Sequence, residues 1–170
     1  VNFEKYFIKY LKNKISSYHL TSYPELEKVY LNLAKYLGVS KSNIVLTGGA
    51  DLGIKNCFEV FIKPRDKVIT ITPTFAMIDV YSKLFQAKQI KFSYDKNLKL
   101  DISKIKKKIN SSIKMIIISN PNNPTGTEIN KKDLIDLIAK ARKFNIPFAV
   151  DEVYYGFSNQ TLLKEIKKFK

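Results

Sequence analysis

Short runs of apolar residues, separated by segments with helical periodicity, constrain the fold of this chain most. The runs lie at residues 44–46, 68–71, 115–118 and 148–150. They are rich in β-branched side chains and too short for helices, which is typical of strands buried on both faces. Strands that alternate with helices pair in parallel through right-handed crossovers. The sequence therefore predicts an α/β fold, a three-layer sandwich with a mostly parallel sheet.

The helical segments place the connections between these strands. Apolar residues recur at i, i+3, i+4 and i+7 between residues 26 and 37 and again between 134 and 141. Pro24 is expected in the first turn of the former helix and Gly38 just past its end. We expect further helices at 51–62, at 102–109 with a solvated lysine face, and from Thr161 to the last residue.

The charge of the chain first suggests an anionic partner. Thirty lysines and arginines against 15 acidic residues give a net charge of +15. Only Arg65 and Arg142 are arginines, however, and arginine is the residue that phosphate and base recognition prefer. We therefore expect lysines spread over the surface and no nucleic acid partner, with a non-catalytic basic binding module as the alternative.

Cellular location is indicated by what the sequence lacks. Its longest apolar runs are far shorter than the roughly 20 residues that span a bilayer, so no membrane association is expected. No signal peptide is visible, and the single cysteine, Cys57, cannot form an internal disulfide. A reducing cytoplasm is the predicted location.

Ligands of such sheets bind at the carboxyl ends of the strands, where two unusual features of this sequence lie. Gly48 and Gly49 precede a predicted helix, and the free amides at a helix N-terminus favour an anionic group such as phosphate. The alternative there is an ordinary turn. Phe75 follows the run at 68–71, where it could stack on a flat heterocycle or pack in the core.

The sharpest local signal is Asn-Pro-Asn-Asn-Pro-Thr-Gly at 120–126. Two prolines and three asparagines directly after a buried strand are poor candidates for generic packing. Asparagine offers both a donor and an acceptor, and the Asn123–Pro124 bond could be cis and aim the amide inward.

Asp151 and Glu152 end the last apolar run and fit two kinds of site. One is the Walker B strand of a nucleotide hydrolase, but the sequence contains no GxxxxGK[ST] phosphate loop. The other is a carboxylate that faces a pyridine nitrogen and keeps it protonated, because a nearby negative charge favours the charged form of the ring.

With these motifs in this order, the chain resembles the fold-type-I pyridoxal 5'-phosphate (PLP) enzymes. It is most similar to the class I/II aminotransferases and, within them, to the histidinol-phosphate aminotransferase-like group. The resemblance implies that Ala50 and Asp51 bind the cofactor phosphate through their amides and that Phe75 stacks on the pyridine ring. It further implies roles for residues late in the chain: Asn123 and Tyr154 on the phenolic oxygen, and Asp151 on the ring nitrogen.

The resemblance also implies partners and boundaries. Tyr23 matches a tyrosine that reaches the cofactor phosphate of the neighbouring subunit, which implies a homodimer. Residues 1–22 correspond to a partial N-terminal segment, and residues 23–170 to an incomplete PLP-binding large domain. The Schiff-base lysine of the family follows in a Ser-x-x-Lys motif and is expected beyond Lys170, so we assign that role to no lysine here.

The expected function is transfer of an amino group from an amino acid to a keto acid or carbonyl acceptor, in amino acid biosynthesis. The parent protein would be the active enzyme and this piece alone inactive. A PLP-dependent decarboxylase or lyase of the same fold is the enzymatic alternative. Leu52, where the histidinol-phosphate group has an acidic residue, and Val153, where alanine is common, weaken the substrate assignment more than the cofactor assignment.

Overall fold

The computed structural model describes residues 4–165, and these divide into two units. The first unit, Val1–Val45, contains α1 (Lys5–Lys14), α2 (Ser17–Thr21), α3 (Glu27–Leu37) and the short 3-10 helix η1 (Lys41–Asn43). Gly38 ends α3 in the left-handed conformation, with φ 67°, as predicted. Pro24 was expected in the first turn of this helix, but the N-cap is Leu26 and Pro24 lies before it.

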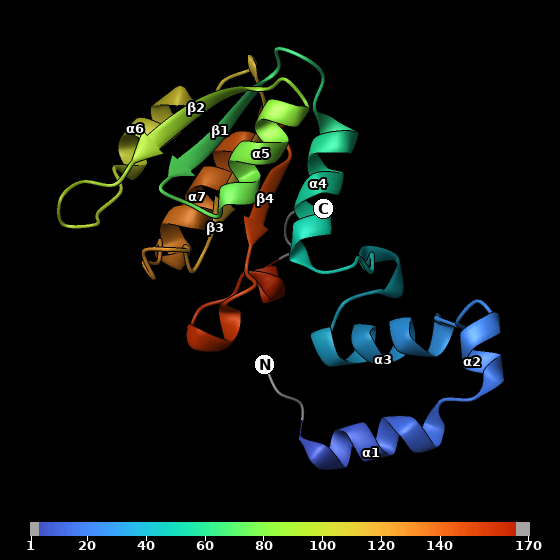
Figure 1. Cartoon of the computed structure of the whole chain (residues 1–170). Helices are drawn as coiled ribbons and strands as arrows, with labels where there is room; N and C mark the ends of the chain where they lie inside the picture. Colours follow the sequence, from blue (N-terminus) through green and yellow to red (C-terminus); the bar gives the residue numbers. More distant parts are fainter. Residues whose placement is uncertain (1–3, 166–170) are drawn as a thin grey trace. The chain divides into compact units, whose positions relative to one another are not determined.

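The second unit, Leu46–Lys170, is built on a four-stranded sheet. Its strands are β1 (Lys67–Thr72), β2 (Lys88–Ser93), β3 (Ile113–Ser119) and β4 (Phe148–Asp151). Every pair is parallel, and the spatial order is β2-β1-β3-β4 (Figure 1). The predicted α/β class with a parallel sheet is confirmed.

Two apolar cores cover the two faces of the sheet. On one face, α4 (Ala50–Phe61) and α5 (Ala76–Leu84) pack against Val68, Met115 and Ile117. On the other, α6 (Ile102–Lys108) and α7 (Lys131–Arg142) pack against Ile69, Ile71, Ile116 and Ile118 (Figure 1). Alternate residues of β1 and β3 thus enter opposite cores, which explains why these strands read as continuous apolar runs. The three-layer sandwich is confirmed.

The prediction of a strand at residues 44–46 was wrong. The segment follows η1, belongs to no strand, and exposes 81% of Val45. Three apolar residues in a row identify a strand only when a neighbouring strand buries them, and here none does. The sheet instead contains β2, whose sequence is Lys-Gln-Ile-Lys-Phe-Ser. Its alternating polar side chains suit an edge strand, and because they interrupt the apolar residues, the sequence did not predict this strand.

The order of the strands places a crevice between the carboxyl ends of β1 and β3. The chain leaves β1 toward α5 on one face and leaves β3 toward α7 on the other. Neighbouring strands whose connections diverge in this way form the usual ligand site of an open α/β sheet.

Two further predictions concern the end of the chain and membrane association. The helix predicted from Thr161 falls partly on residues 166–170, which lie outside the described residues; before them, Leu162 is buried in the core of α6 and α7. No helix between residues 4 and 165 is long and apolar enough to cross a bilayer.

The central strands should dominate the stability of the second unit. Ile116 on β3 is fully buried, so Ile116→Ala is expected to lower the free energy of unfolding by roughly 2–5 kcal/mol through lost burial and a residual cavity. Urea denaturation of the purified protein measures the change. The control Val60→Ala, at a site 71% exposed on α4, should stay within about 0.5 kcal/mol. Equal losses in both variants would contradict this assignment of the core.

Candidate functional site

A cavity of about 250 Å³ lies at the carboxyl ends of β1, β3 and β4. Its lining includes six of the seven predicted cofactor-binding residues: Ala50, Asp51, Phe75, Asn123, Asp151 and Tyr154. Gly49 and Val153 complete it. Residues from four separate stretches of the sequence therefore meet around one space.

Asp151 is held in a fixed orientation by its neighbours. It ends β4 and is paired in register with Ser119, the last residue of β3. The Ser119 hydroxyl donates to Oδ2 of Asp151 at 3.1 Å, and the backbone N–H of Val153 donates to Oδ1 at 3.1 Å. Both carboxylate oxygens thus have a donor, while the half-buried side chain still borders the cavity. This arrangement presents a negative charge to a bound ligand.

The three asparagines of residues 120–126 make different contacts. Asn120 is buried, and its Oδ1 accepts from the N–H of Ile129 at 2.7 Å. Asn122, also buried, donates to the carbonyl of Pro73 at 3.0 Å and so joins the loops that follow β1 and β3. Asn123 alone of the three lines the cavity. The predicted cis bond at Asn123–Pro124 is present, as are two others at Thr72–Pro73 and Asn120–Pro121.

Asn123 and Tyr154 form a polar pair at the cavity. The side-chain N–H of Asn123 donates to the Tyr154 hydroxyl at 3.2 Å. Tyr154 lies on a loop that Glu152 closes, because the two oxygens of Glu152 accept from the Thr161 hydroxyl and from the N–H of Leu162, each at 2.7 Å. An amide and a phenol placed together can bind an oxygen substituent of a ligand.

Phe75 lies between the cavity and the apolar core. It is the N-cap residue of α5 and lines the cavity, while part of its ring packs against the core beneath α4 and α5. An aromatic face at this position is available for stacking.

The N-terminus of α4 forms another wall. Gly49 is its N-cap, with φ 96° and ψ 173°, and supplies no side-chain cap for the first-turn amides. Uncapped amides at the start of a 12-residue helix carry partial positive charge and attract anions. The cavity thus has a carboxylate in one wall and helix amides in another.

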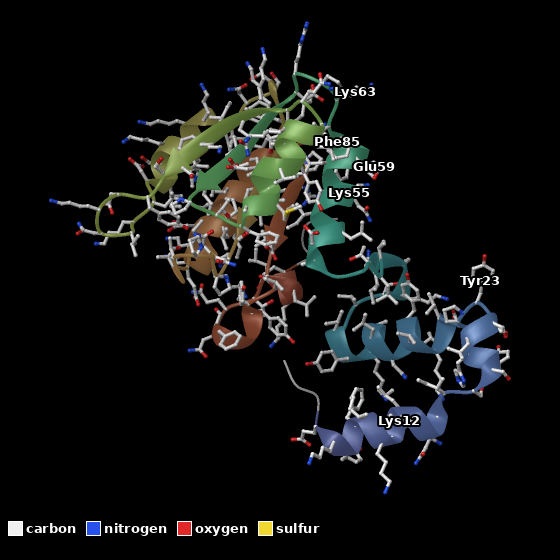
Figure 2. All side chains as sticks on the ribbon, in the orientation of Figure 1. Lys12, Tyr23, Lys55, Glu59, Lys63 and Phe85 are labelled. Carbon is white, nitrogen blue, oxygen red and sulfur yellow. The ribbon has the colours of Figure 1, made fainter. Side chains whose placement is uncertain are left out.

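Tyr23, the seventh predicted residue, lies in the first unit. Its side chain is 97% exposed and projects from the segment between α2 and α3 (Figure 2). It is not among the residues that line the cavity.

Two residues of the site's surroundings were not found from the sequence. Ser119 supports Asp151, and the only signal for it was its place at the end of a buried strand beside Asn120. The hydroxyl of Tyr81, on α5, donates to the Asp51 carboxylate at 3.1 Å. The two residues are 30 positions apart in the sequence, and no local pattern links them. Contacts of this kind depend on the packing of helices.

Comparison with known proteins identifies the family of this chain. Residues 7–168 match the family model described as aminotransferase class I and II. The chain belongs to this aminotransferase family. Relatives named histidinol-phosphate aminotransferase include those of Clostridium novyi, 36% identical over 168 residues, and Dehalococcoides mccartyi, 32% identical over 164 residues. The alignments cover 95% of this chain but only 46% and 44% of those proteins.

Solved structures support the same family fold. The histidinol-phosphate aminotransferase from Clostridium acetobutylicum superposes with a TM-score of 0.81 at 27% identity, over 98% of this chain and 49% of that one. Cystalysin from Treponema denticola, a structure that contains a pyridoxal 5'-phosphate cofactor, gives a TM-score of 0.78 at 21% identity, over 95% and 44%. This chain thus spans about half the length of the proteins that it matches.

A side chain at position 49 should strain the backbone and lower the stability of the protein. Its φ and ψ fall in a region that is essentially restricted to glycine, so Gly49→Ala is expected to lower the free energy of unfolding by about 1–3 kcal/mol. Gly156→Ala is the matched control, because Gly156 lacks a positive φ and an added Cβ there meets nothing within 4 Å. Thermal unfolding of both variants measures the difference. A Gly49→Ala protein as stable as the control would show that the turn before α4 relaxes freely.

Proposed function

We propose that the protein to which this chain belongs is a PLP-dependent aminotransferase, which transfers an amino group from an amino acid to a keto acid or carbonyl acceptor. The observation that carries the proposal is the meeting of six predicted cofactor-binding residues around one cavity. They come from positions 50, 51, 75, 123, 151 and 154, and together they supply backbone amides, an aromatic face, a side-chain amide, a phenol and a carboxylate. Family membership supports the reaction class.

The donors and acceptors around the cavity fit the parts of PLP. A phosphate suits the amides of Ala50 and Asp51 at the start of α4. A flat pyridine ring suits the face of Phe75, and its phenolic oxygen suits the Asn123 and Tyr154 pair. A cationic ring nitrogen suits the carboxylate of Asp151. When bound, PLP acts as an electron sink that stabilises negative charge at the α-carbon of an amino acid.

Asp151 would hold the proton on the ring nitrogen, because a fixed carboxylate beside that atom favours its charged form. Ser119 and the Val153 amide stop this carboxylate from turning away. Asn123, Tyr154 and Phe75 would set the tilt and depth of the ring. These are roles in binding and orientation, and the covalent attachment of the cofactor is assigned to no residue of this chain.

The relatives' name makes histidinol phosphate the first amino donor to assay. Leu52, a 39% exposed residue in the first turn of α4, differs from the acidic residue expected in that group, so other amino acids belong in the same panel. We further propose a homodimer in which Tyr23 reaches the phosphate of the neighbouring subunit; its 97% exposure in a single chain leaves it available for that contact. The cytoplasm stays the predicted location.

Replacing the carboxylate tests the proposal. Asp151→Asn keeps the shape of the side chain but removes its charge, and a charge pair of about 4 kcal/mol near a protein surface corresponds to a loss of roughly 100-fold to 1,000-fold in turnover. Asp136→Asn is the control, since its ion pair with Lys106 lies on the exposed faces of α6 and α7 and contributes little. The assay follows amino transfer and ammonia release separately, with PLP added, in the purified complete protein to which this chain belongs.

Three outcomes decide the matter. Amino transfer that is lost in Asp151→Asn and kept in Asp136→Asn supports the proposal. Release of ammonia without transfer would move the assignment to a lyase, and unchanged turnover in Asp151→Asn would falsify the role of that carboxylate.

A further inference from the structure

Asp51 places a negative charge next to the proposed phosphate-binding site. It is the second residue of α4 and lines the cavity at the helix N-terminus. An aspartate in the first turn can fold back onto the free amides of its own helix. A carboxylate in that position would occupy the donors that a phosphate needs and would repel its charge.

The Asp51 carboxylate makes a different contact. Its Oδ1 accepts the Tyr81 hydroxyl at 3.1 Å, so the side chain is turned toward α5. Among residues 4–165, no ion pair joins Asp51 to a lysine or arginine. The nearby Lys55 pairs with Glu59 at 2.9 Å, one turn further along α4 (Figure 2). Tyr81 is therefore the group that fixes this carboxylate.

Tyr81 is well suited to act as a fixed donor. Only 7% of its side chain is exposed, and its ring packs against Phe58 with centroids 6.4 Å apart. Burial, and then the neighbouring carboxylate, raise the pKa of the Tyr81 phenol above its ordinary value. The hydroxyl consequently keeps its proton, and remains a donor, throughout the neutral pH range.

We propose that Tyr81 is a positioning residue that draws the Asp51 carboxylate away from the first-turn amides of α4 and so leaves them to the phosphate of the cofactor. The inference rests on the proposed function. It assigns the phosphate affinity of the site partly to a side chain that does not line the cavity.

The test compares PLP with pyridoxal, which lacks the phosphate. Dissociation constants of both ligands are measured by absorbance titration of the purified protein. Tyr81→Phe removes only the hydroxyl and is expected to weaken PLP about tenfold, because the freed carboxylate then opposes a second anion across a few ångströms. Pyridoxal binding should not change. Ser82→Ala is the control, since it removes another buried hydroxyl of α5, one that donates to the carbonyl of Ile78.

A second substitution makes the test specific. In an Asp51→Asn background, Tyr81→Phe should have no effect on PLP affinity, because no charge is left to be positioned. Asp51→Asn alone should bind PLP as tightly as the unsubstituted protein or up to about threefold more tightly, and this holds even if Tyr81→Phe fails to fold.

Distinct results overturn the inference and the proposed function. Equal losses for PLP and pyridoxal in Tyr81→Phe, or a loss that persists with Asn at position 51, would show that Tyr81 acts through general packing. Selective weakening of PLP by Asp51→Asn would show that the carboxylate supports phosphate binding. If the unsubstituted protein bound PLP no more tightly than pyridoxal, the proposed phosphate-binding site would be wrong, and so would the proposed function.

Discussion

Neighbouring strands β1 and β3 send their connections to opposite faces of the sheet, and the candidate site exists because of this divergence. The loop after β1 carries Phe75 and the loop after β3 carries Asn123. Asn122 joins the two loops through the carbonyl of Pro73, and β4 adds Asp151 beside Ser119. The isoleucine-rich strands therefore serve the site directly, since their burial on both faces fixes where each of these residues emerges.

Much of this arrangement could be read from local patterns. Apolar runs identified β1, β3 and β4, and the residues directly after them supplied most of the cavity wall. The pattern failed where burial is not continuous. Polar alternation hid the edge strand β2, and the short run at residues 44–46 resembled a strand without having a partner.

Contacts between distant residues could not be predicted in the same way. The bond from Tyr81 to Asp51 depends on how α5 packs beside α4, and the bond from Ser119 to Asp151 depends on the register of β3 with β4. Helix packing and strand register are set by the whole core, so no short stretch of sequence contains them. These contacts orient the charged groups that the motifs only identify.

The carboxylate of Glu152 has a consequence for the energetics of binding. It anchors residues 161 and 162 to the end of β4, so the intervening segment with Tyr154 is closed at both ends before any ligand arrives. The entropy of ordering this segment is lost during folding, when the hydrophobic core compensates it. A ligand that meets an already ordered Tyr154 keeps more of its contact energy as affinity, which is the advantage of preorganisation.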